Sequence, residues 1–310
     1  MRWLSLMNET RNLVGDTMAS APVGTAGPSA VRTRPDRCPG ILRPWPADDG
    51  LLVRLRLVAG NLTVDALTAL VQVAQSFGDG RIHLTSRANL QLRGLPDDGT
   101  GHLTTPVHRA LTDTGLLPAP THDLVRNVMA SPLTGIDGGR TDLTALARDL
   151  DRGIRASQSL AGLPGKFLFV LDDGRGDLMG HWCDLGLVAL DDHSVQLRVG
   201  DHYAAVVELS RAVPELLALA ERFVAERGDG PEAAWHVNEL TSPLADAQPA
   251  DPRLPRPDEP LPFVAADGWE HLAVGADGIA GEELLARLAG QARVRVTPWY
   301  GIVVWDGGQA

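Results

Sequence analysis

The first regular alternation of apolar and polar positions predicts a strand, a helix and a second strand. Arg54 and Arg56 alternate with apolar neighbours over residues 51–57, which is typical of a half-buried strand. Thr63 is a suitable N-cap for the following helix, whose apolar stripe consists of Val64, Leu67, Leu70, Val71, Ala74 and Phe77. Residues 81–95 then return as a strand. The predicted unit is therefore strand, helix, strand.

The same order of elements returns near the end of the chain. Residues 268–274 predict a strand, residues 281–290 a short helix and residues 294–305 a pair of strands. Thr297 then occupies the place that Thr85 has in the first unit, an offset of 297 − 85 = 212 residues. This offset is far too large for a solenoid, so the pattern predicts a duplicated half-domain with an insertion between the copies. Chance similarity between two β-α-β units is the alternative.

The insertion predicts a mixed α/β domain. Helical spacing occurs at 102–115, 141–160 and 211–227, the last with Pro214 in its first turn, and apolar runs predict strands at 167–171, 185–190, 195–199 and 203–209. Seven prolines between residues 241 and 262 predict an extended linker.

The expected fold class is α+β, with two half-domains that pair into one module around a central mixed α/β domain. The expected boundaries are a disordered tail at 1–35, half-domain 1 at 36–100, the α/β domain at 101–240, the proline-rich linker at 241–262 and half-domain 2 at 263–310.

One stretch of the first unit carries unusual polar chemistry. Side chains alternate along a strand, so one face of an extended Thr85–Gly94 presents Thr85, Arg87, Asn89, Gln91 and Arg93. Two guanidinium groups beside two carboxamides, with no carboxylate among them, suit a ligand that has several carboxylates. The strand can divide near Ala88–Asn89. A solvated strand face is the alternative interpretation.

Arg126, Asn127 and Lys166 are further candidates for the same ligand surface. A single basic residue of this kind is more often a surface charge. Together, Arg87, Arg93, Arg126 and Lys166 would supply four cations, each able to form a charge-assisted contact of roughly 1.5–3 kcal/mol with an acid. Ordering and desolvation would reduce the sum. Asn89, Gln91 and Asn127 would orient the ligand.

The composition is that of a soluble globular protein. The 310 residues are 44% hydrophobic and 22% charged, which allows two or three domains with sizeable cores. No apolar run approaches the roughly 20 residues needed to cross a bilayer, and the N-terminal segment lacks the apolar core of a secretory signal. We therefore expect a cytoplasmic protein with no membrane partner.

The charge narrows the class of ligand. A net charge of −11 argues against a nucleic-acid partner, since nucleic-acid binding normally shows as a basic domain. It does not exclude an anionic small molecule, because binding of such a molecule depends on the local potential. Lys166 is the only lysine among 28 basic residues. Genomic base composition is the simpler explanation of that bias.

The two cysteines, Cys38 and Cys183, are too few for a disulfide framework, a four-thiolate zinc site or a cluster with four thiolate ligands. Cys38 is most simply a structural thiol. His181 lies two residues before Cys183, but without further ligands nearby the pair is a weak metal signal. We expect no metal site here.

Several motifs resemble those of the sirohaem-type nitrite and sulfite reductases, and most closely those of their relatives, the precorrin-3B synthases of cobalamin biosynthesis. They appear in family order as R-C-P-G-I-L at 37–42, D-G-L-L-V-R-L-R at 49–56, L-T-S-R-A-N-L-Q-L-R-G-L at 84–95, V-R-N-V-M-A-S-P-L-T-G-I-D at 125–137, L-P-G-K-F at 163–167 and V-T-P-W-Y-G-I at 296–302. The motifs at 84–95 and 125–137, which contain Arg87 and Arg126, are quite specific, and the others support them.

The resemblance implies two ferredoxin-like half-domains joined in one module, each followed by a larger α/β domain. It implies a tetrapyrrole that lies against residues similar to Arg87, Arg126 and Lys166. Sulfite-reducing relatives carry a second lysine where this chain has Leu168, which favours the precorrin-3B synthase branch. Those synthases hydroxylate precorrin-3A with dioxygen and an iron–sulfur cluster.

The resemblance also implies cofactors that this chain does not fully provide for. Sirohaem or a related tetrapyrrole and a [4Fe-4S] cluster are expected of the family, whose cluster cysteines lie after the second half-domain. With Cys38 and Cys183 alone, no cluster is expected in this chain by itself. A cluster-carrying protein or a second subunit is therefore the expected partner.

The expected function is that of a precorrin-3B synthase-like oxidoreductase, incomplete without a cluster domain, that binds a polycarboxylated tetrapyrrole. One alternative is a non-catalytic tetrapyrrole-binding protein. The other is a fragment similar to part of a nitrite or sulfite reductase. The sequence leaves catalytic activity and catalytic residues undetermined.

Overall fold

The computed structural model describes Asp36 and residues 38–308, and the tail expected at residues 1–35 lies outside them. The strands are β1 (Trp45–Ala47), β2 (Gly50–Leu55), β3 (Asn61–Thr63), β4 (Arg81–Leu84), β5 (Leu90–Leu95), β6 (Val128–Ala130), β7 (Phe169–Asp172), β8 (Leu185–Ala189), β9 (Ser194–Val199), β10 (His202–Glu208), β11 (Ala265–Ala266), β12 (Trp269–Ala273), β13 (Ile279–Ala280), β14 (Arg293–Val296) and β15 (Gly301–Trp305). The α-helices are α1 (Val64–Phe77), α2 (Thr105–Asp113), α3 (Thr144–Ala156), α4 (Leu209–Glu226) and α5 (Gly281–Arg287).

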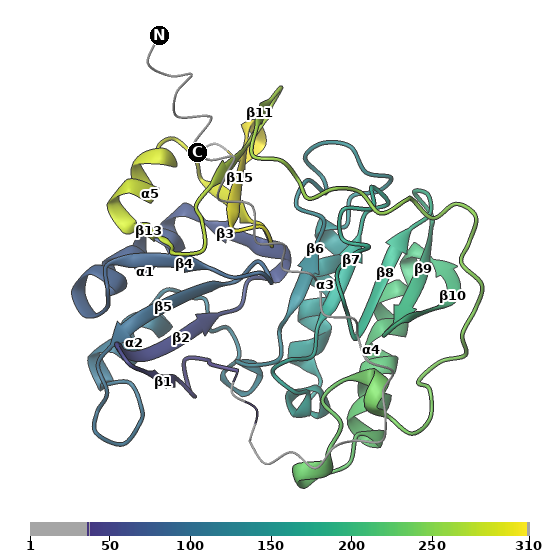
Figure 1. The fold of residues 1–310 in the computed structure, drawn as a ribbon, viewed down its shortest axis with the longest axis horizontal. Helices are drawn as coiled ribbons and strands as arrows, with labels where there is room; N and C mark the ends of the chain where they lie inside the picture. Colours follow the sequence, from purple (N-terminus) through teal and green to yellow (C-terminus); the bar gives the residue numbers. More distant parts are fainter. Residues whose placement is uncertain (1–35, 37, 309–310) are drawn as a thin grey trace.

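Three five-stranded sheets organise these elements (Figure 1). Their strand orders are β1-β2-β5-β4-β13, β11-β12-β15-β14-β3 and β10-β9-β8-β7-β6. The first two sheets form the module of paired half-domains, and the third belongs to the central mixed α/β domain beside it (Figure 1). The expected α+β class and architecture are therefore confirmed.

The first half-domain forms from the pattern that predicted it. The alternating segment becomes β2, with Val53 and Leu55 buried and Arg54 on the opposite face. Thr63 caps α1, since its hydroxyl oxygen accepts a hydrogen bond from the Ala66 N–H at 3.2 Å. The stripe of α1 is buried at Leu67, Leu70, Val71 and Ala74.

The second half-domain repeats the first at the level of individual hydrogen bonds. The Thr85 N–H donates to the Asn89 carbonyl at 3.0 Å, and the Thr297 N–H donates to the Gly301 carbonyl at 2.9 Å. Each turn contains a left-handed residue, Ala88 with φ 54° or Tyr300 with φ 58°. The offset is again 300 − 88 = 212 residues. The predicted duplication is confirmed, although α5 ends at Arg287, before the expected Gly290.

The half-domains exchange short strands, which the sequence pattern did not predict. β3 precedes α1 but pairs antiparallel with β14, while β13 precedes α5 but pairs antiparallel with β4. The first N–H group of each helix also donates a hydrogen bond to the other half-domain. The Val64 N–H donates to the Ala292 carbonyl at 2.9 Å, and the Gly281 N–H donates to the Gly80 carbonyl at 3.1 Å. Each sheet therefore depends on a strand from the other.

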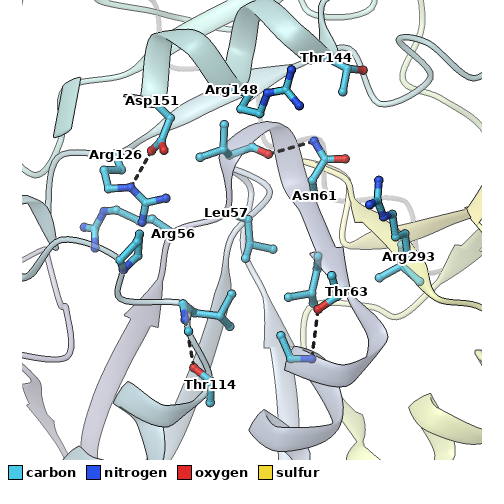
Figure 2. Close-up of a pocket in the computed structure, with 17 residues that line it drawn as sticks. Arg56, Leu57, Asn61, Thr63, Thr114, Arg126, Thr144, Arg148, Asp151 and Arg293 are labelled. Carbon is cyan, nitrogen blue, oxygen red and sulfur yellow. Dashed lines mark hydrogen bonds and ion pairs between the residues drawn. The ribbon is translucent and has the colours of Figure 1, made fainter. Parts of the chain in front are cut away.

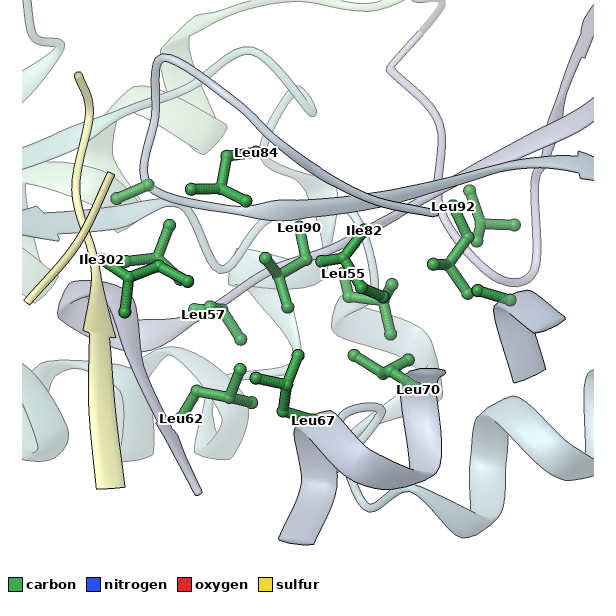
Figure 3. Close-up of a cluster of buried hydrophobic side chains, with 14 of the residues drawn as sticks. Leu55, Leu57, Leu62, Leu67, Leu70, Ile82, Leu84, Leu90, Leu92 and Ile302 are labelled. Carbon is green, nitrogen blue, oxygen red and sulfur yellow. The ribbon is translucent and has the colours of Figure 1, made fainter. Parts of the chain in front are cut away.

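One hydrophobic core serves both half-domains. Leu55, Ile82 and Leu90 from the first sheet face Leu67 and Leu70 of α1 (Figure 3). The other labelled members of this cluster are Leu57, Leu62, Leu84, Leu92 and Ile302, the last from β15 (Figure 3). Met129 and Val170 of the central sheet join the same core, so the module packs directly on the central domain.

The central sheet has three parallel strands, β6, β7 and β8, and continues antiparallel through β9 and β10. A second core, which includes Phe167, Phe169 and Phe223, holds α3 and α4 against it. The helix expected at 211–227 instead begins at Leu209, whose N–H donates to the His193 carbonyl at 2.7 Å. Pro214 is consequently the sixth helical residue and not in the first turn.

A buried loop after β7 is organised by carboxylates. Asp172 accepts hydrogen bonds from the N–H groups of Gly174, Gly176 and Leu178 at 2.9–3.0 Å. Asp177 accepts one from the Ser131 hydroxyl at 2.7 Å, while its Oδ2 has no hydrogen bond and lies 3.9 Å from Arg175 Nε. Burial, and then the nearby Asp172 charge, raise the pKa of Asp177 to about 7.

The proline-rich stretch follows α4 and precedes β11. It passes along the edge of the central sheet back to the module (Figure 1). The Gln248 N–H donates to the Tyr203 carbonyl of β10 at 2.8 Å. Within the described residues, no helix is long and apolar enough to cross a membrane.

Gly60 tests the strand exchange. Gly60 (φ 71°) and Gly80 (φ 74°) both adopt left-handed backbone, but a Cβ at Gly60 would collide with the Val296 carbonyl oxygen, whereas a Cβ at Gly80 meets nothing within 4 Å. Gly80→Ala should cost only the left-handed conformation, about 1–2 kcal/mol. Gly60→Ala should lower the free energy of unfolding clearly more, as measured by urea denaturation. Equal losses in the two variants would contradict the close approach of β3 and β14.

Asp177 should make stability depend on pH. Its pKa is about 7 in the folded protein and about 3.9 when unfolded, so between those values the folded state holds a proton that the unfolded state releases. The free energy of unfolding should therefore fall as pH rises through this window. Asp177→Asn should remove that fall and exceed the wild type in stability above pH 7, as measured by urea unfolding at several pH values. Asp113→Asn, on the surface of α2, is the control, and parallel curves for wild type and Asp177→Asn would contradict the assignment.

Candidate functional site

The polar stretch Thr85–Gly94 is not one continuous strand. β4 ends at Leu84, residues 85–89 form a tight turn, and β5 begins at Leu90. The expected division near Ala88–Asn89 is present, because Ala88 has a left-handed backbone. The expectation of a single strand face for all five polar side chains is therefore wrong, since Thr85, Arg87 and Asn89 lie in the turn.

Arg87 reaches from this turn to the central domain. Its Nη1 donates to the Lys166 carbonyl at 3.0 Å, and burial lowers the pKa of its guanidinium group. The Lys166 ammonium group lies 4.8 Å from the centre of the Trp235 ring, a cation–π distance. The Arg87 side chain and the Lys166 main chain thus meet at the junction of half-domain 1 and the central domain.

Arg54 completes this junction and was not among the predicted site residues. Its Nη2 donates to Gln91 Oε1 at 3.4 Å, and its buried Nε has no partner. Burial lowers the pKa of Arg54, and the Arg87 charge lowers it further. We call the surface formed by Arg54, Arg87, Gln91 and Lys166 the turn surface. The alternation of Arg54 in its strand was the signal that could have identified it.

Asn89 supports the turn surface from below. It is 1% exposed, and its Oδ1 accepts a hydrogen bond from the Leu57 N–H at 2.9 Å. Its Nδ2 has no partner. The side chain therefore connects the turn to the end of β2 and retains one unused buried donor.

Arg93 is engaged away from the turn. Its Nε and Nη2 donate to the two carboxylate oxygens of Asp49 at 2.9 and 3.2 Å, a bidentate ion pair near the surface. This contact accounts for the raised pKa of Arg93 and the lowered pKa of Asp49. The structure does not bring Arg93 together with Arg87 and Lys166.

Asn127 has a fully used carboxamide. Its Oδ1 accepts from Arg56 Nε at 3.1 Å, and its Nδ2 donates to the carbonyl oxygens of Leu124, Gly165 and Phe167 at 3.0–3.2 Å. It is 2% exposed. Asn127 therefore holds the Lys166 loop in place from inside the protein.

Arg126 lines a cavity that none of the turn-surface residues lines. Its Nε donates to Asp151 Oδ1 of α3 at 2.6 Å, and both side chains are 8% exposed. The cavity measures about 550 Å³ and lies between α3 and the half-domain module. Figure 2 shows Arg126 beside Arg56 at one end, with Arg148 and Arg293 toward the other. We call this cavity, defined by Arg56, Arg126, Arg148 and Arg293, the arginine pocket.

The thiols do not form a metal site within the described residues. Cys38 and Cys183 are both free and buried, and no group of three or more His, Cys, Asp or Glu residues there could hold a metal ion. Burial raises the pKa of both thiols, that of Cys183 to about 11. A four-thiolate cluster does not fit this donor set.

A polycarboxylated tetrapyrrole fits the turn surface better. Arg54 Nε and Asn89 Nδ2 are buried donors without acceptors, and neither Arg54 nor Gln91 contacts a carboxylate in the described part of the chain. Propionate and acetate groups of a macrocycle would supply the missing acceptors. The indole ring of Trp235 beside Lys166 adds a flat apolar wall.

Comparison with known proteins agrees with these features. Residues 46–103 match the nitrite/sulfite reductase ferredoxin-like half-domain. A precorrin-3B synthase from Sinorhizobium sp is 35% identical over 152 residues, which cover 49% of this chain and 31% of the synthase. A ferredoxin–nitrite reductase from Synechococcus elongatus is 34% identical over 131 residues, which cover 40% of this chain and 25% of the reductase.

The fold also matches a solved structure. The NirA protein of Mycobacterium tuberculosis superposes with a TM-score of 0.64 over 87% of this chain and 59% of NirA, at 21% sequence identity. The matches to the curated relatives span about a third of their length or less. Residues 46–103 therefore form a ferredoxin-like half-domain of the nitrite and sulfite reductase type, and the chain as a whole shares the NirA fold.

Proposed function

We propose that this chain binds a polycarboxylated tetrapyrrole on the turn surface, as part of a precorrin-3B synthase-like oxidoreductase of cobalamin biosynthesis. The observation that carries the proposal is the cluster of guanidinium and carboxamide donors around the turn, two of them buried without acceptors. Unpaired buried donors cost free energy, which acceptors on a ligand would recover.

Each residue of the turn surface has a distinct role in this proposal. Arg87 and Lys166 bind carboxylates from the two sides of the domain junction. The hydrogen bond from Arg87 to the Lys166 carbonyl holds the two residues next to each other. Arg54 offers its free Nε, and Gln91, held by Arg54, orients the ligand. Asn89 contributes through its free Nδ2 or by fixing the turn. Arg93, Arg126 and Asn127 have protein partners and lie outside the proposed contacts.

The choice of the precorrin-3B synthase branch rests on two further points. The curated synthase matches a larger share of this chain than the curated reductase. In addition, Lys166 is the only lysine of the sequence. Leu168, at the position of the second lysine, is 4% exposed and packs in the core of the half-domain module. An oxyanion-reducing site with two neighbouring lysines is therefore disfavoured.

A non-catalytic tetrapyrrole-binding protein is the second candidate. It needs only the turn surface, whereas turnover in the first candidate needs cluster ligands beyond the two buried thiols. We assign no catalytic step to residues of this chain.

Titration with sirohaem, followed by visible absorption, tests the shared binding step. The wild type should shift the spectrum with a dissociation constant in the micromolar range or below. Arg87→Ala should weaken binding by about tenfold or more, since a charge-assisted hydrogen bond contributes roughly 1.5–3 kcal/mol. Its melting temperature should change little, and Arg87→Lys should recover part of the affinity.

Two control variants sharpen this titration. Arg93→Ala should bind like the wild type, because Arg93 is already paired with Asp49. Arg211→Ala removes an arginine from the exposed face of α4 and should also have no effect. Absence of any spectral shift with the wild type, or equal weakening in all three alanine variants, would refute the turn surface as the binding site.

A further inference from the structure

The arginine pocket carries more positive charge than the protein around it neutralises. Its lining includes four guanidinium groups and one carboxylate, that of Asp151, a difference of 4 − 1 = 3 charges. Asp151 is occupied by Arg126 and by Arg155, whose Nε atoms donate to its two oxygens at 2.6 and 2.8 Å. The other three arginines form no ion pair within the described residues, although the Asp123 charge acts on Arg56.

Arg56 is the strongest indication of a missing anion. It is 3% exposed and donates to three neutral acceptors, Asn127 Oδ1 and the carbonyl oxygens of Pro39 and Asp123, at 2.9–3.1 Å. Its Nη2 is buried with no partner. Burial lowers the pKa of Arg56 to about 10. A buried guanidinium group without a carboxylate is costly, and an anion in the adjoining cavity would offset that cost.

Arg148 and Arg293 approach the pocket from two other elements, α3 and β14 (Figure 2). Neither side chain forms a hydrogen bond or ion pair with any residue from 38 to 308. Both are exposed, so neither is needed for core packing. Exposed arginines without partners, converging on one cavity, are suited to bind an entering anion.

The remaining lining is mixed. It combines Thr63, Thr114 and Thr144 with apolar Leu57, Val58, Leu62, Leu116 and Val294, and no aromatic side chain lines the pocket. The 14-residue helix α1 also begins there, with Thr63 and Ala66 in the lining and Asp65 outside it. The positive end of the helix dipole adds to the attraction for an anion. A cavity of about 550 Å³ accommodates a small metabolite, but it is too small to hold a macrocycle as well.

We propose that the arginine pocket binds a small polyanion carrying phosphate or carboxylate groups. Arg148 and Arg293 contact it directly, and Arg56 and Arg126 supply positive charge at the inner end. The ligand would connect α3 of the central domain with β14 of half-domain 2, so its binding would stabilise the junction between domain and module. This inference is independent of the proposed tetrapyrrole function, because it uses none of the residues of the turn surface.

Thermal unfolding and calorimetry with pyrophosphate and citrate test the proposal. The two probes separate a phosphate ligand from a carboxylate ligand, and sodium chloride at the same ionic strength controls for screening. At least one probe should raise the melting temperature in a concentration-dependent way and bind at one site per chain. The double variant Arg148→Ala/Arg293→Ala should weaken that binding by about tenfold or more.

Matched controls keep the result interpretable. Both substitutions remove exposed arginines without partners, so the unliganded double variant should melt at or near the wild-type temperature. Arg109→Ala, on the exposed face of α2, should bind the probe like the wild type. Sirohaem titration of the double variant should also match the wild type. Unchanged probe binding in the double variant, an equal rise with sodium chloride, or no response to either anion would overturn the proposal.

Discussion

Strand exchange between the half-domains is the constraint on which the rest of the structure depends. β3 and β13 are only three and two residues long, and each completes the sheet of the other half. Because each sheet includes a strand from the other copy, the two cannot separate without breaking main-chain hydrogen bonds as well as a shared core. The exchange therefore fixes both sheets as one rigid support for β2, whose outer face carries Arg54.

Arg56 connects this support to the central domain. Its guanidinium group donates simultaneously to Asn127, to the Asp123 carbonyl and to the Pro39 carbonyl, so it joins residues 123–127 to a segment more than 80 residues earlier in the sequence. Only a planar, multidentate donor can reach three acceptors in this way, whereas a lysine ammonium group would present a single point of charge. Asn127 in turn holds the Lys166 loop. The position of Lys166 relative to Arg87 is consequently set by hydrogen bonds within the protein, without a bound ligand.

The sequence was most informative where a period repeats over several residues. The apolar stripe of α1, the N-cap at Thr63 and the duplication at an offset of 212 residues all came from local regularities, and the structure contains each of them. β3 and β13 were missed because strands of two or three residues show no period. Their pairing is set by the other half-domain, so no local pattern encodes it.

The polar side chains were harder to place, for a related reason. Alternation assigned Thr85, Arg87 and Asn89 to one face of a strand, but the left-handed Ala88 turns the chain at that point. Residue type also did not separate Arg93, which finds Asp49, from Arg54, which finds no carboxylate. Which arginine is neutralised depends on tertiary neighbours, and those neighbours were not visible in the sequence.

The distribution of carboxylates connects the two cationic surfaces. The chain has 39 acidic and 28 basic residues, so acidic groups are in excess by 11. Many arginines in the described part of the chain do pair with them, as Arg93, Arg126 and Arg175 show. Arg56 is buried and Arg54 half-buried, and neither forms an ion pair within the described residues, although in an acidic protein such partners are readily available. Desolvation makes an unpaired cation unfavourable, so an arrangement that retains these two next to candidate binding surfaces is better explained by anionic ligands than by folding alone.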